Sequence, residues 1–422
     1  MPSRRTRSAP HKLIFDPVHG PIAFRGAPLA LLGTPEFQRL WGIRQTGFAH
    51  LVFPGANHTR LEHSLGAYWV AEQMAEHLDL APADGGRVTV GALLHDLGHG
   101  PFSHTLDGPM VEVLGHGHEA LSRRRIEGTD RDWPEERIEV PRVLERHGLS
   151  PRSVADLVDP PSGGPGPALF REILHGAVDS DRIDYLQRDA YYTGVAHGAI
   201  DAVRLLDTVR SVHGRIAFAE KGRSAVEGFL VGRALMYSSV YYHKTVRAAE
   251  MMAQAAFERQ SGYPDTARGL FRVTDGELLV RLAEGGPVSA ALVRGLLDRR
   301  LFKRAYGTRS VTRATRAAWR RFVRAPTERR ALEDEIAARA RAPPGSVLID
   351  LAGLEPRGVP EEDWDRLGLL VGARTTYPFR APSPWHALAT RAPADWPVSV
   401  FAAPRWRASV ARVLSTGRVA LP

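Results

Sequence analysis

The stretch 95–107 holds a high density of side chains that could do chemistry: His95, Asp96, His99, His104 and Asp107. An imidazole next to a carboxylate is a ligand pair for a divalent transition metal. Imidazole also titrates near neutral pH and a carboxylate can fix its tautomer, so the same groups could transfer protons. The alternative for the adjacent His-Asp pair alone is a hydrogen-bonded cap at a helix end.

Two predicted helices position the first of these groups. Apolar residues recur at helical spacing before position 97, which predicts a buried helix with His95 and Asp96 in its last turn and an end at Gly98. Another helix opens at 57–60 and carries His63 on its apolar face. A lone inward histidine can be a hydrogen-bonded core residue. Because the His-Asp pair follows 32 residues later, a natural distance for neighbouring antiparallel helices, we interpret His63 as a ligand.

A third predicted helix begins near 179–181 and offers a row of functional side chains. Asp181, Tyr185 and Asp189 lie four residues apart and therefore share one face of this helix. The face presents a carboxylate, an aromatic ring and a second carboxylate. The alternative is a surface ladder of ion pairs with Arg182 and Arg188.

Two imidazoles and two carboxylates from these three helices make one candidate metal site: His63, His95, Asp96 and Asp181. This mixture suits Mn, Fe, Co, Ni or Zn better than Ca and leaves positions for water or a phosphate oxygen. Such a metal lowers the pKa of water and polarises a phosphoryl group, so phosphoester hydrolysis is the natural reaction class. The groups left for proton transfer are His99, His104, Asp107 and His118. The cations available for phosphate charge are Arg60, Arg182 and Arg233.

The composition indicates the class of protein and limits the possible metal ligands. The 422 residues, 43% hydrophobic and 24% charged, are those of an ordinary globular protein with room for a large core. The absence of cysteine excludes disulfides and thiolate ligands, so any metal must be held by His, Asp, Glu or water. No apolar run is long enough to cross a bilayer, and the basic start has no signal-peptide core. We therefore expect a cytoplasmic protein that contacts no membrane.

The net charge of +9 predicts attraction to polyanions, either nucleic acid or a highly charged nucleotide. Much of the positive charge is arginine between 294 and 341, interleaved with Leu and Ala at helical spacing. A solvated helical surface explains this pattern about as well as a weak nucleic-acid site does, so both interpretations stay open.

Turn and periodicity signals outline the remaining elements. A Pro/Gly turn between apolar runs predicts a hairpin over 13–24, and Thr34 with Pro35 opens a helix that we expect to end near 45–47. Further helices are predicted over 231–252, 278–284, 290–301, 314–338 and 406–414. Strands are predicted over 346–351 and 397–401.

Six motifs in consistent order resemble those of a known family: 16–20, 52–56, 60–66, 95–104, 181–189 and 243–245. The pattern of His63, His95-Asp96 and Asp181 resembles the signature of the HD superfamily of metal-dependent phosphohydrolases. The six motifs together resemble the deoxynucleoside triphosphate triphosphohydrolases of that superfamily. The resemblance covers about residues 12–260.

The resemblance implies a mainly α fold: an HD-domain helical bundle with a short N-terminal β-hairpin and a smaller α+β C-terminal part. The division it suggests is a disordered basic tail (1–11), an HD catalytic domain (12–260), a helical extension (261–342) and a small α+β region (343–422). It also implies a dNTP partner, an allosteric nucleotide and a homo-oligomer, either a dimer, a tetramer or a hexamer.

The activity implied is cleavage of a dNTP at its α-phosphate, which releases deoxynucleoside and inorganic triphosphate. The candidate metal set would hold the divalent ion, and Mg could accompany the nucleotide. The implied acid/base set is His99, His104, Asp107 and His118, with His104 protonating the leaving 5′-oxygen. The implied substrate contacts are Gln45, Arg60, Arg182, Tyr185, Asp189, Arg233 and Tyr241.

In this interpretation Tyr185 packs beneath the deoxyribose and so excludes a 2′-hydroxyl, while Asp189 accepts the 3′-hydroxyl. Tyr237 and Tyr242 depart from the family pattern and leave the base preference open. The alternatives are an HD nucleotidase or phosphodiesterase of other specificity and a non-catalytic nucleotide or nucleic-acid binder. An intact set of ligand and acid/base residues argues against the binder, because binding requires no acid/base groups.

Overall fold

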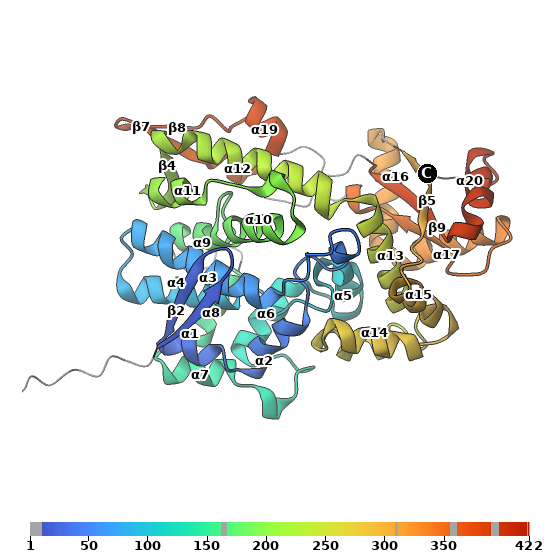
Figure 1. Ribbon diagram of the computed structural model, residues 1–422, viewed down its shortest axis with the longest axis horizontal. Helices are drawn as coiled ribbons and strands as arrows, with labels where there is room; N and C mark the ends of the chain where they lie inside the picture. The colour runs from blue at the N-terminus through green and yellow to red at the C-terminus, as the bar shows by residue number, and fades with distance from the viewer. Residues whose placement is uncertain are drawn as a thin grey trace, which may run out of the picture.

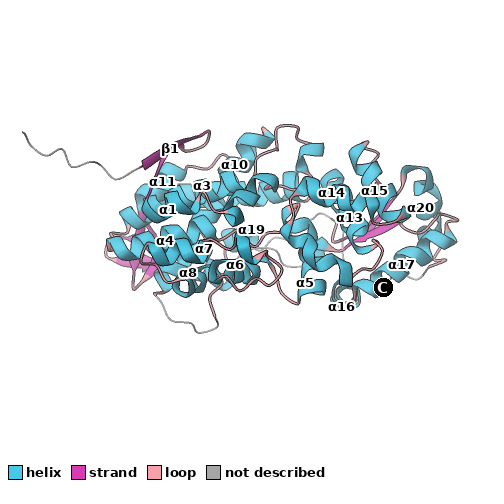
Figure 2. Ribbon diagram, turned by 90° about the horizontal axis from the view of Figure 1, so that it is seen from below, coloured by secondary structure: helices cyan, strands magenta, loops and turns pink. Residues whose placement is uncertain are grey.

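The computed structural model describes residues 11–161, 167–308, 311–354, 361–389, 396–419 and 421. Most of the chain is helical, and the strands form three small sheets (Figures 1 and 2). This agrees with the mainly α class expected from the sequence. No described helix is long and apolar enough to span a membrane.

The first ten helices contain most of the candidate site. They are Gly26–Leu31 (α1), Pro35–Gln38 (α2), Arg60–His77 (α3), Pro82–Leu94 (α4), Asp107–Leu114 (α5), His118–Glu127 (α6), Val140–Arg146 (α7), Pro151–Val158 (α8), Ala168–His175 (α9) and Ser180–Thr193 (α10). The later helices are Ala202–Thr208 (α11), Arg223–Met236 (α12), Lys244–Glu258 (α13), Asp275–Glu284 (α14), Pro287–Leu297 (α15), Arg313–Arg324 (α16), Pro326–Arg339 (α17), Glu361–Arg366 (α18), Pro384–Ala389 (α19) and Arg407–Ser415 (α20).

The strands are His11–Asp16 (β1), Gly20–Arg25 (β2), Val209–Val212 (β3), Arg215–Ala219 (β4), Lys303–Thr308 (β5), Val347–Asp350 (β6), Gly368–Val371 (β7), Arg374–Thr376 (β8) and Val398–Ala402 (β9). β1 and β2 form the antiparallel hairpin predicted from the Pro/Gly turn. The predicted strands over 346–351 and 397–401 are β6 and β9, which pair antiparallel in a sheet of order β5-β9-β6.

One sheet joins parts of the chain that are far apart in sequence. Its order is β3-β4-β7-β8, and β4 pairs parallel with β7. Figure 1 shows β7, β8 and α19 beside α11 and α12, on the opposite side of the molecule from α20. None of these four strands was predicted: each is short, and only the pairing of β4 with β7 joins the two local hairpins β3-β4 and β7-β8 into one sheet.

Local capping sets the start of the two helices that carry His63 and Asp181. At α3 the Thr59 hydroxyl accepts the Glu62 backbone N–H, and the Glu62 carboxylate accepts the Thr59 backbone N–H, which makes a capping box. At α10 the Asp179 carboxylate accepts the Arg182 backbone N–H. The helix α3 packs against both α4 and α10, so the three ligand-bearing segments meet.

Several predicted boundaries are wrong. The helix before the His-Asp pair ends at Leu94, with His95 as its C-cap and Asp96 in the following turn, rather than at Gly98. The helix opened by Thr34 and Pro35 ends at Gln38 and continues as a 3₁₀ turn to Gly42, not to 45–47. At the first of these ends the Ser122 hydroxyl donates to the His95 carbonyl oxygen at 2.7 Å, a donor that local periodicity does not reveal.

Two long predicted helices are each divided. The segment 231–252 contains the end of α12, a π-helical turn at Tyr237–Tyr241 and the start of α13. That turn directs the Tyr241 hydroxyl to Asp189, an example of the irregular helical turns found at functional sites. The segment 314–338 divides between α16 and α17 at Pro326, because proline has no N–H to continue the first helix.

Close packing of α3 on α10 requires glycine at position 66. A Cβ atom there would overlap the Asp184 carboxylate and the Arg188 guanidinium, both fully buried. We expect Gly66→Ala to lower the free energy of unfolding by about 3 kcal/mol, because the overlap must displace a buried ion pair. Denaturant unfolding measures this change. The matched control is Gly86→Ala on α4, where nothing lies within 4 Å. It should leave stability unchanged or raise it by up to about 1 kcal/mol, and equal stabilities of the two variants would contradict the prediction.

Candidate active site

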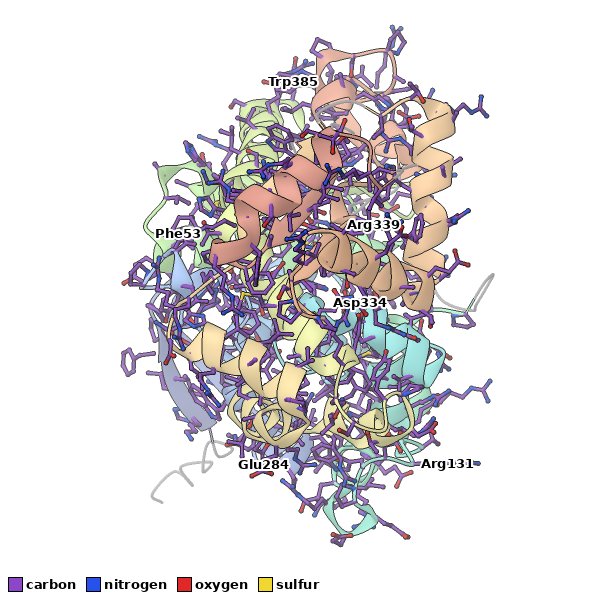
Figure 3. All side chains as sticks on the ribbon, turned by 90° about the vertical axis from the view of Figure 1, so that its right-hand side faces the viewer. Phe53, Arg131, Glu284, Asp334, Arg339 and Trp385 are labelled. Atoms are coloured by element: carbon purple, nitrogen blue, oxygen red, sulfur yellow. The ribbon has the colours of Figure 1, made fainter. Side chains whose placement is uncertain are left out.

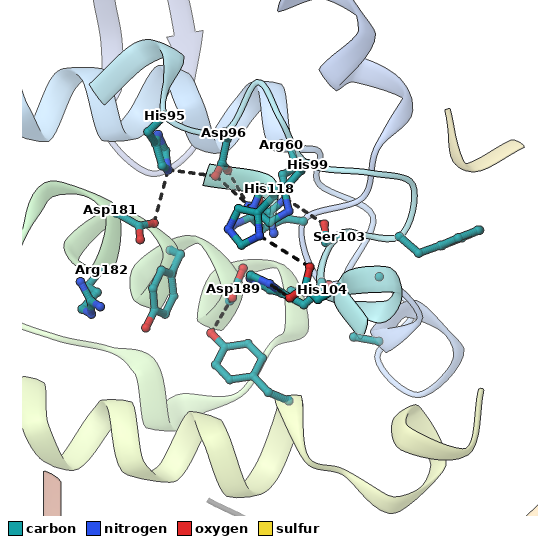
Figure 4. Close-up of a pocket in the computed structure, with 18 of the residues that line it drawn as sticks. Arg60, His95, Asp96, His99, Ser103, His104, His118, Asp181, Arg182 and Asp189 are labelled. Carbon is teal, nitrogen blue, oxygen red and sulfur yellow. Dashed lines mark hydrogen bonds and ion pairs between the residues drawn. The ribbon is translucent and has the colours of Figure 1, made fainter. Parts of the chain in front are cut away.

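The structure brings the four candidate metal ligands together. His63 Nε2 lies 3.3 Å from His95 Nε2, 3.0 Å from Asp181 Oδ1 and 3.6 Å from Asp96 Oδ2. His95 Nε2 lies 3.2 Å from Asp96 Oδ1 and 3.7 Å from Asp181 Oδ1. Two imidazole nitrogens and two carboxylates thus face a common centre, as Figure 4 shows for three of the four residues.

Hydrogen bonds on the far side of each imidazole orient it toward this centre. His63 Nδ1 lies 2.7 Å from Asp184 Oδ2, and His95 Nδ1 lies 2.7 Å from the Ala92 carbonyl oxygen. Since these oxygens only accept, each Nδ1 carries a hydrogen and each Nε2 faces the centre, where its lone pair can bind a metal once the ring is neutral. The rings therefore have the tautomer that a metal ligand needs.

Sequence reasoning missed the network that fixes Asp184. Its Oδ1 lies 2.6 Å from His19 Nε2, and Arg188 donates to both of its oxygens at 2.9 Å. Arg188 also donates to Asp16 at 2.7 Å, so the hairpin and α10 are joined behind the ligands. Arg188, the proposed member of a surface ladder, is completely buried. The available signals were the Asp16–Gly20 motif and the place of Asp184 one turn after Asp181.

The carboxylates of the candidate metal set change the pKa values of the imidazoles that they face. Burial opposes the charge of His63, yet hydrogen bonds with Asp181 and Asp184 raise its pKa to about 10. Burial opposes the charge of Asp181 as well, yet hydrogen bonds with His63 and His95 hold the pKa of Asp181 well below its usual range. Without a metal the cluster therefore holds protons, and a metal ion must displace them.

This competition predicts a pH dependence of metal affinity. Because the raised pKa of His63 keeps its ring protonated at neutral pH, binding of Mn releases at least one proton. We expect affinity to rise about tenfold per pH unit between about pH 6 and about pH 8. Calorimetric titration of the metal-free protein with Mn at several pH values measures this slope, and a pH-independent affinity would contradict it.

The four candidate acid/base residues form a second cluster beside the first. His104 Nδ1 lies 2.9 Å from Asp107 Oδ2, and His118 Nδ1 lies 3.6 Å from Asp107 Oδ1. The rings of His99 and His118 stack with centroids 3.8 Å apart, and His99 Nε2 lies 3.3 Å from Asp96 Oδ1. Burial and the Arg60 charge hold the pKa of His99 well below its usual range, whereas Asp107 raises the pKa of His118 against the opposing effect of burial.

Both clusters border one cavity of about 440 Å³. Of the sequence-predicted site residues, all but two line it: Gln45, Arg60, His95, Asp96, His99, His104, Asp107, His118, Asp181, Arg182, Tyr185, Asp189 and Tyr241. The exceptions are His63, which is fully buried behind the wall, and Arg233. Sequence reasoning gave no role to six further charged or polar lining residues: Thr46, Ser103, Glu119, His175, Arg247 and Glu250.

Comparisons with known proteins agree with this geometry. The family model described as HD domain matches residues 60–189, and the model described as HD associated region matches residues 200–416. The second match alone spans half of the chain. The protein belongs to the HD-domain family. The matched HD domain begins at Arg60 of α3 and ends at Asp189 of α10, so it contains all four candidate ligands.

Related proteins carry several descriptions. An uncharacterized protein of Methanocaldococcus jannaschii is 39% identical over 58% of this chain and 49% of its own length. Human deoxynucleoside triphosphate triphosphohydrolase SAMHD1 is 29% identical over 60% of this chain and 45% of its own. The matches thus span about half of these curated relatives.

Solved structures share the whole fold. A phosphohydrolase from Bacteroides thetaiotaomicron has a TM-score of 0.70 at 23% identity and covers 94% of this chain and 100% of its own. A hypothetical protein from Aquifex aeolicus has a TM-score of 0.71 at 27% identity, with coverage of 96% and 100%. The arrangement of the HD domain and the associated region is therefore shared beyond the helical bundle alone.

Three of the candidate substrate contacts in this HD-domain protein already have protein partners. Arg60 donates to Asp96 at 2.5 Å and to Ser103 at 2.8 Å, so it faces the metal set. Arg182 forms an ion pair with Asp179 and donates to the Gly176 carbonyl at 3.1 Å. Arg233 lies over the rings of Tyr237 and Trp364, with Cζ 4.7 Å and 6.0 Å from their centroids. Arg233 therefore borders the cavity only through Tyr237.

Asp189 is held from two sides at the floor of the cavity. Its Oδ1 lies 2.7 Å from His58 Nε2, and its Oδ2 accepts the Tyr241 hydroxyl at 2.5 Å. A carboxylate oxygen has two acceptor sites, so a substrate hydroxyl can still bind there. The Tyr185 ring lies edge-on to Tyr241, with centroids 6.2 Å apart. The row predicted on α10 is thus an inward face rather than a surface ladder.

The donor set fits a divalent transition metal. Two neutral imidazoles with preset lone pairs and two carboxylates supply four ligand atoms, and the cavity leaves space for further oxygen ligands. The structure does not distinguish among Mn, Fe, Co, Ni and Zn, because these metals share this ligand chemistry.

Proposed function

We propose that this HD-domain protein is a metal-dependent phosphohydrolase that cleaves deoxynucleoside triphosphates to deoxynucleoside and inorganic triphosphate. The observation that carries the proposal is that the four candidate donors His63, His95, Asp96 and Asp181 face a common centre and that a His/Asp cluster lies beside them at the same cavity. The similarity to relatives described as deoxynucleoside triphosphate triphosphohydrolases supports the choice of substrate.

In the proposed site His63, His95, Asp96 and Asp181 hold the divalent ion. The bound ion supplies Lewis-acid polarisation of a phosphoryl oxygen and a lowered pKa for water. Arg60 lies against Asp96 and faces the same phosphoryl group, so its fixed charge stabilises negative charge there as the reaction proceeds. Arg182 adds a second cation on the Asp181 side of the cavity.

His104 is the proposed proton donor to the leaving 5′-oxygen. Asp107 holds its Nδ1, which leaves Nε2 for the substrate, and about half of the side chain is exposed toward the cavity. An imidazole held by a carboxylate is the usual arrangement of a general acid. His99 and His118 stack behind it and fix its surroundings.

The nucleoside is proposed to lie against the aromatic wall formed by Tyr185 and Tyr241. Packing of the sugar on Tyr185 excludes a 2′-hydroxyl, and Asp189 accepts the 3′-hydroxyl. Comparison of dGTP with GTP tests this preference. From the family resemblance we also propose a homo-oligomer and an intracellular location, for which the cysteine-free chain is suited, and an added nucleotide is tested as an activator.

The experiment is incubation with each dNTP and Mn, followed by ion-exchange chromatography of the products. Deoxynucleoside and triphosphate, both lost in Asp181→Ala and His104→Ala, would support the proposal. Orthophosphate or pyrophosphate would instead favour a nucleotidase or phosphodiesterase. If no dNTP is cleaved with any added metal or nucleotide activator, the proposal fails, and salt-sensitive DNA binding without turnover would favour a non-catalytic binder.

A further inference from the structure

His175 is a cavity residue to which neither the sequence motifs nor the proposed mechanism gives a role. It is the last residue of α9 and lines the cavity, within electrostatic reach of Asp181 and Arg182. Its Nε2 lies 2.8 Å from the Leu157 carbonyl oxygen of α8. Among the described residues this is its single hydrogen bond, so its Nδ1 has no protein partner.

The position of His175 corresponds to the phosphate end of the proposed substrate. Figure 4 shows Asp181 and Arg182 on one side of the His95-Asp96 pair and His104 with Ser103 on the other. If His104 protonates the leaving 5′-oxygen, the nucleoside lies on the His104 side. The β- and γ-phosphates then extend toward Arg182, whose guanidinium donates to the carbonyl of Gly176, the residue after His175.

We propose that His175 is a further substrate-binding residue, which as an imidazolium donates an Nδ1 hydrogen bond to the terminal phosphates of a triphosphate chain. This rests on the proposed function, because it uses the His104 side as the nucleoside end. Since the carbonyl of Leu157 only accepts, Nε2 must carry a hydrogen. In the neutral ring Nδ1 is therefore an acceptor and repels phosphate oxygens, whereas in the cation it donates a charge-assisted bond.

The charged groups that face His175 come from two elements. Burial first, then His95 at the end of α4 and Arg182 on α10, lower the pKa of His175, while Asp181 and the hydrogen bond to Leu157 raise it. A bound triphosphate chain brings several negative charges, which favour the charged form of the His175 ring. The contact therefore forms with uptake of a proton, and it strengthens as pH falls.

Two substitutions separate phosphate binding by His175 from its structural hydrogen bond to the Leu157 carbonyl. In His175→Gln the amide nitrogen replaces Nε2, so the bond to Leu157 is kept and the cavity-facing nitrogen is lost. In His175→Asn the amide nitrogen replaces Nδ1, so a donor faces the cavity at every pH. Matching thermal unfolding midpoints establish that each variant is folded.

The probe is inorganic tripolyphosphate, titrated calorimetrically into the metal-loaded protein at about pH 6 and about pH 8. We expect wild type to bind about tenfold more tightly than His175→Gln at the lower pH and about equally at the higher pH. His175→Asn should bind more tightly than His175→Gln at both. For dNTP turnover, His175→Gln should raise KM with little change in kcat.

The inference is overturned if His175→Gln equals wild type at the lower pH, if the ratio is the same at both pH values, or if wild type does not bind tripolyphosphate. Product chromatography separates this from the proposed function. Triphosphate release with an unchanged affinity in His175→Gln defeats the inference alone. A His175-dependent affinity in a protein that releases no triphosphate defeats the proposed reaction alone.

Discussion

Asp181→Asn is expected to reduce dNTP hydrolysis by at least about 10³-fold and to lower the bound metal well below one ion per chain. The side chain keeps its size but loses the charge that faces both candidate imidazoles, with Oδ1 3.0 Å from His63 Nε2 and 3.7 Å from His95 Nε2. An amide is a poor ligand for a transition metal, and its NH₂ group would face the other donors. Elemental analysis and product chromatography measure the two effects.

The control is Asp207→Asn, which removes an exposed carboxylate paired with Lys221 outside the cavity. It should retain both metal and activity. If Asp181→Asn keeps a full complement of metal and the wild-type rate, Asp181 is not a ligand, and the row on α10 has another purpose. If it keeps metal but loses activity, the carboxylate acts on substrate rather than on the ion.

His104→Gln is expected to lower kcat for dNTP hydrolysis by about 10²–10⁴-fold while the bound metal is unchanged. The glutamine has no proton to give at the right pKa, and His104 lies in the 3₁₀ turn Ser103–Leu106 before α5, outside the set of four candidate ligands. Steady-state kinetics with parallel elemental analysis distinguishes this variant from Asp181→Asn, which loses metal.

A substrate with a better leaving group tests the assigned role directly. In p-nitrophenyl triphosphate the departing nitrophenolate is stable without a proton, so loss of the general acid should matter little. We therefore expect His104→Gln to lose far less activity on that compound than on dNTPs. His147→Gln, an exposed histidine away from the cavity, is the control. Equal losses on both substrates would show that His104 positions substrate instead of donating a proton.

Much of the candidate site could be predicted from local sequence patterns. Helical periodicity placed His63 on a buried face, and the spacing of Asp181, Tyr185 and Asp189 placed them on one face of α10. Their types then selected the class of metal and the class of reaction, since imidazole and carboxylate ligands have characteristic chemistry. The roles of the individual residues remain predictions that the variants above test.

Helix ends were less predictable than helix faces. The stop at Leu94 and the π-helical turn at Tyr237–Tyr241 depend on partners from elsewhere. The Ser122 hydroxyl on α6 donates to the His95 carbonyl at the end of α4, and the π-helical turn directs Tyr241 toward Asp189 on α10. A periodic pattern reports which residues are buried, but it contains no information about which distant group will satisfy a helix end.

The sequence by itself therefore predicted a candidate metal site, its ligand types and the reaction class they allow, because these predictions follow from residue chemistry and from spacing within single helices. Only the tertiary structure decided what holds the site in place. The bond between His19 and Asp184 joins residues 165 apart, and the parallel pairing of β4 with β7 joins 215–219 to 368–371. The tertiary structure also placed His175 in the cavity wall near Arg182, and it placed Arg233 outside the cavity. Contacts between distant segments leave no local signal, since they depend on how whole helices pack.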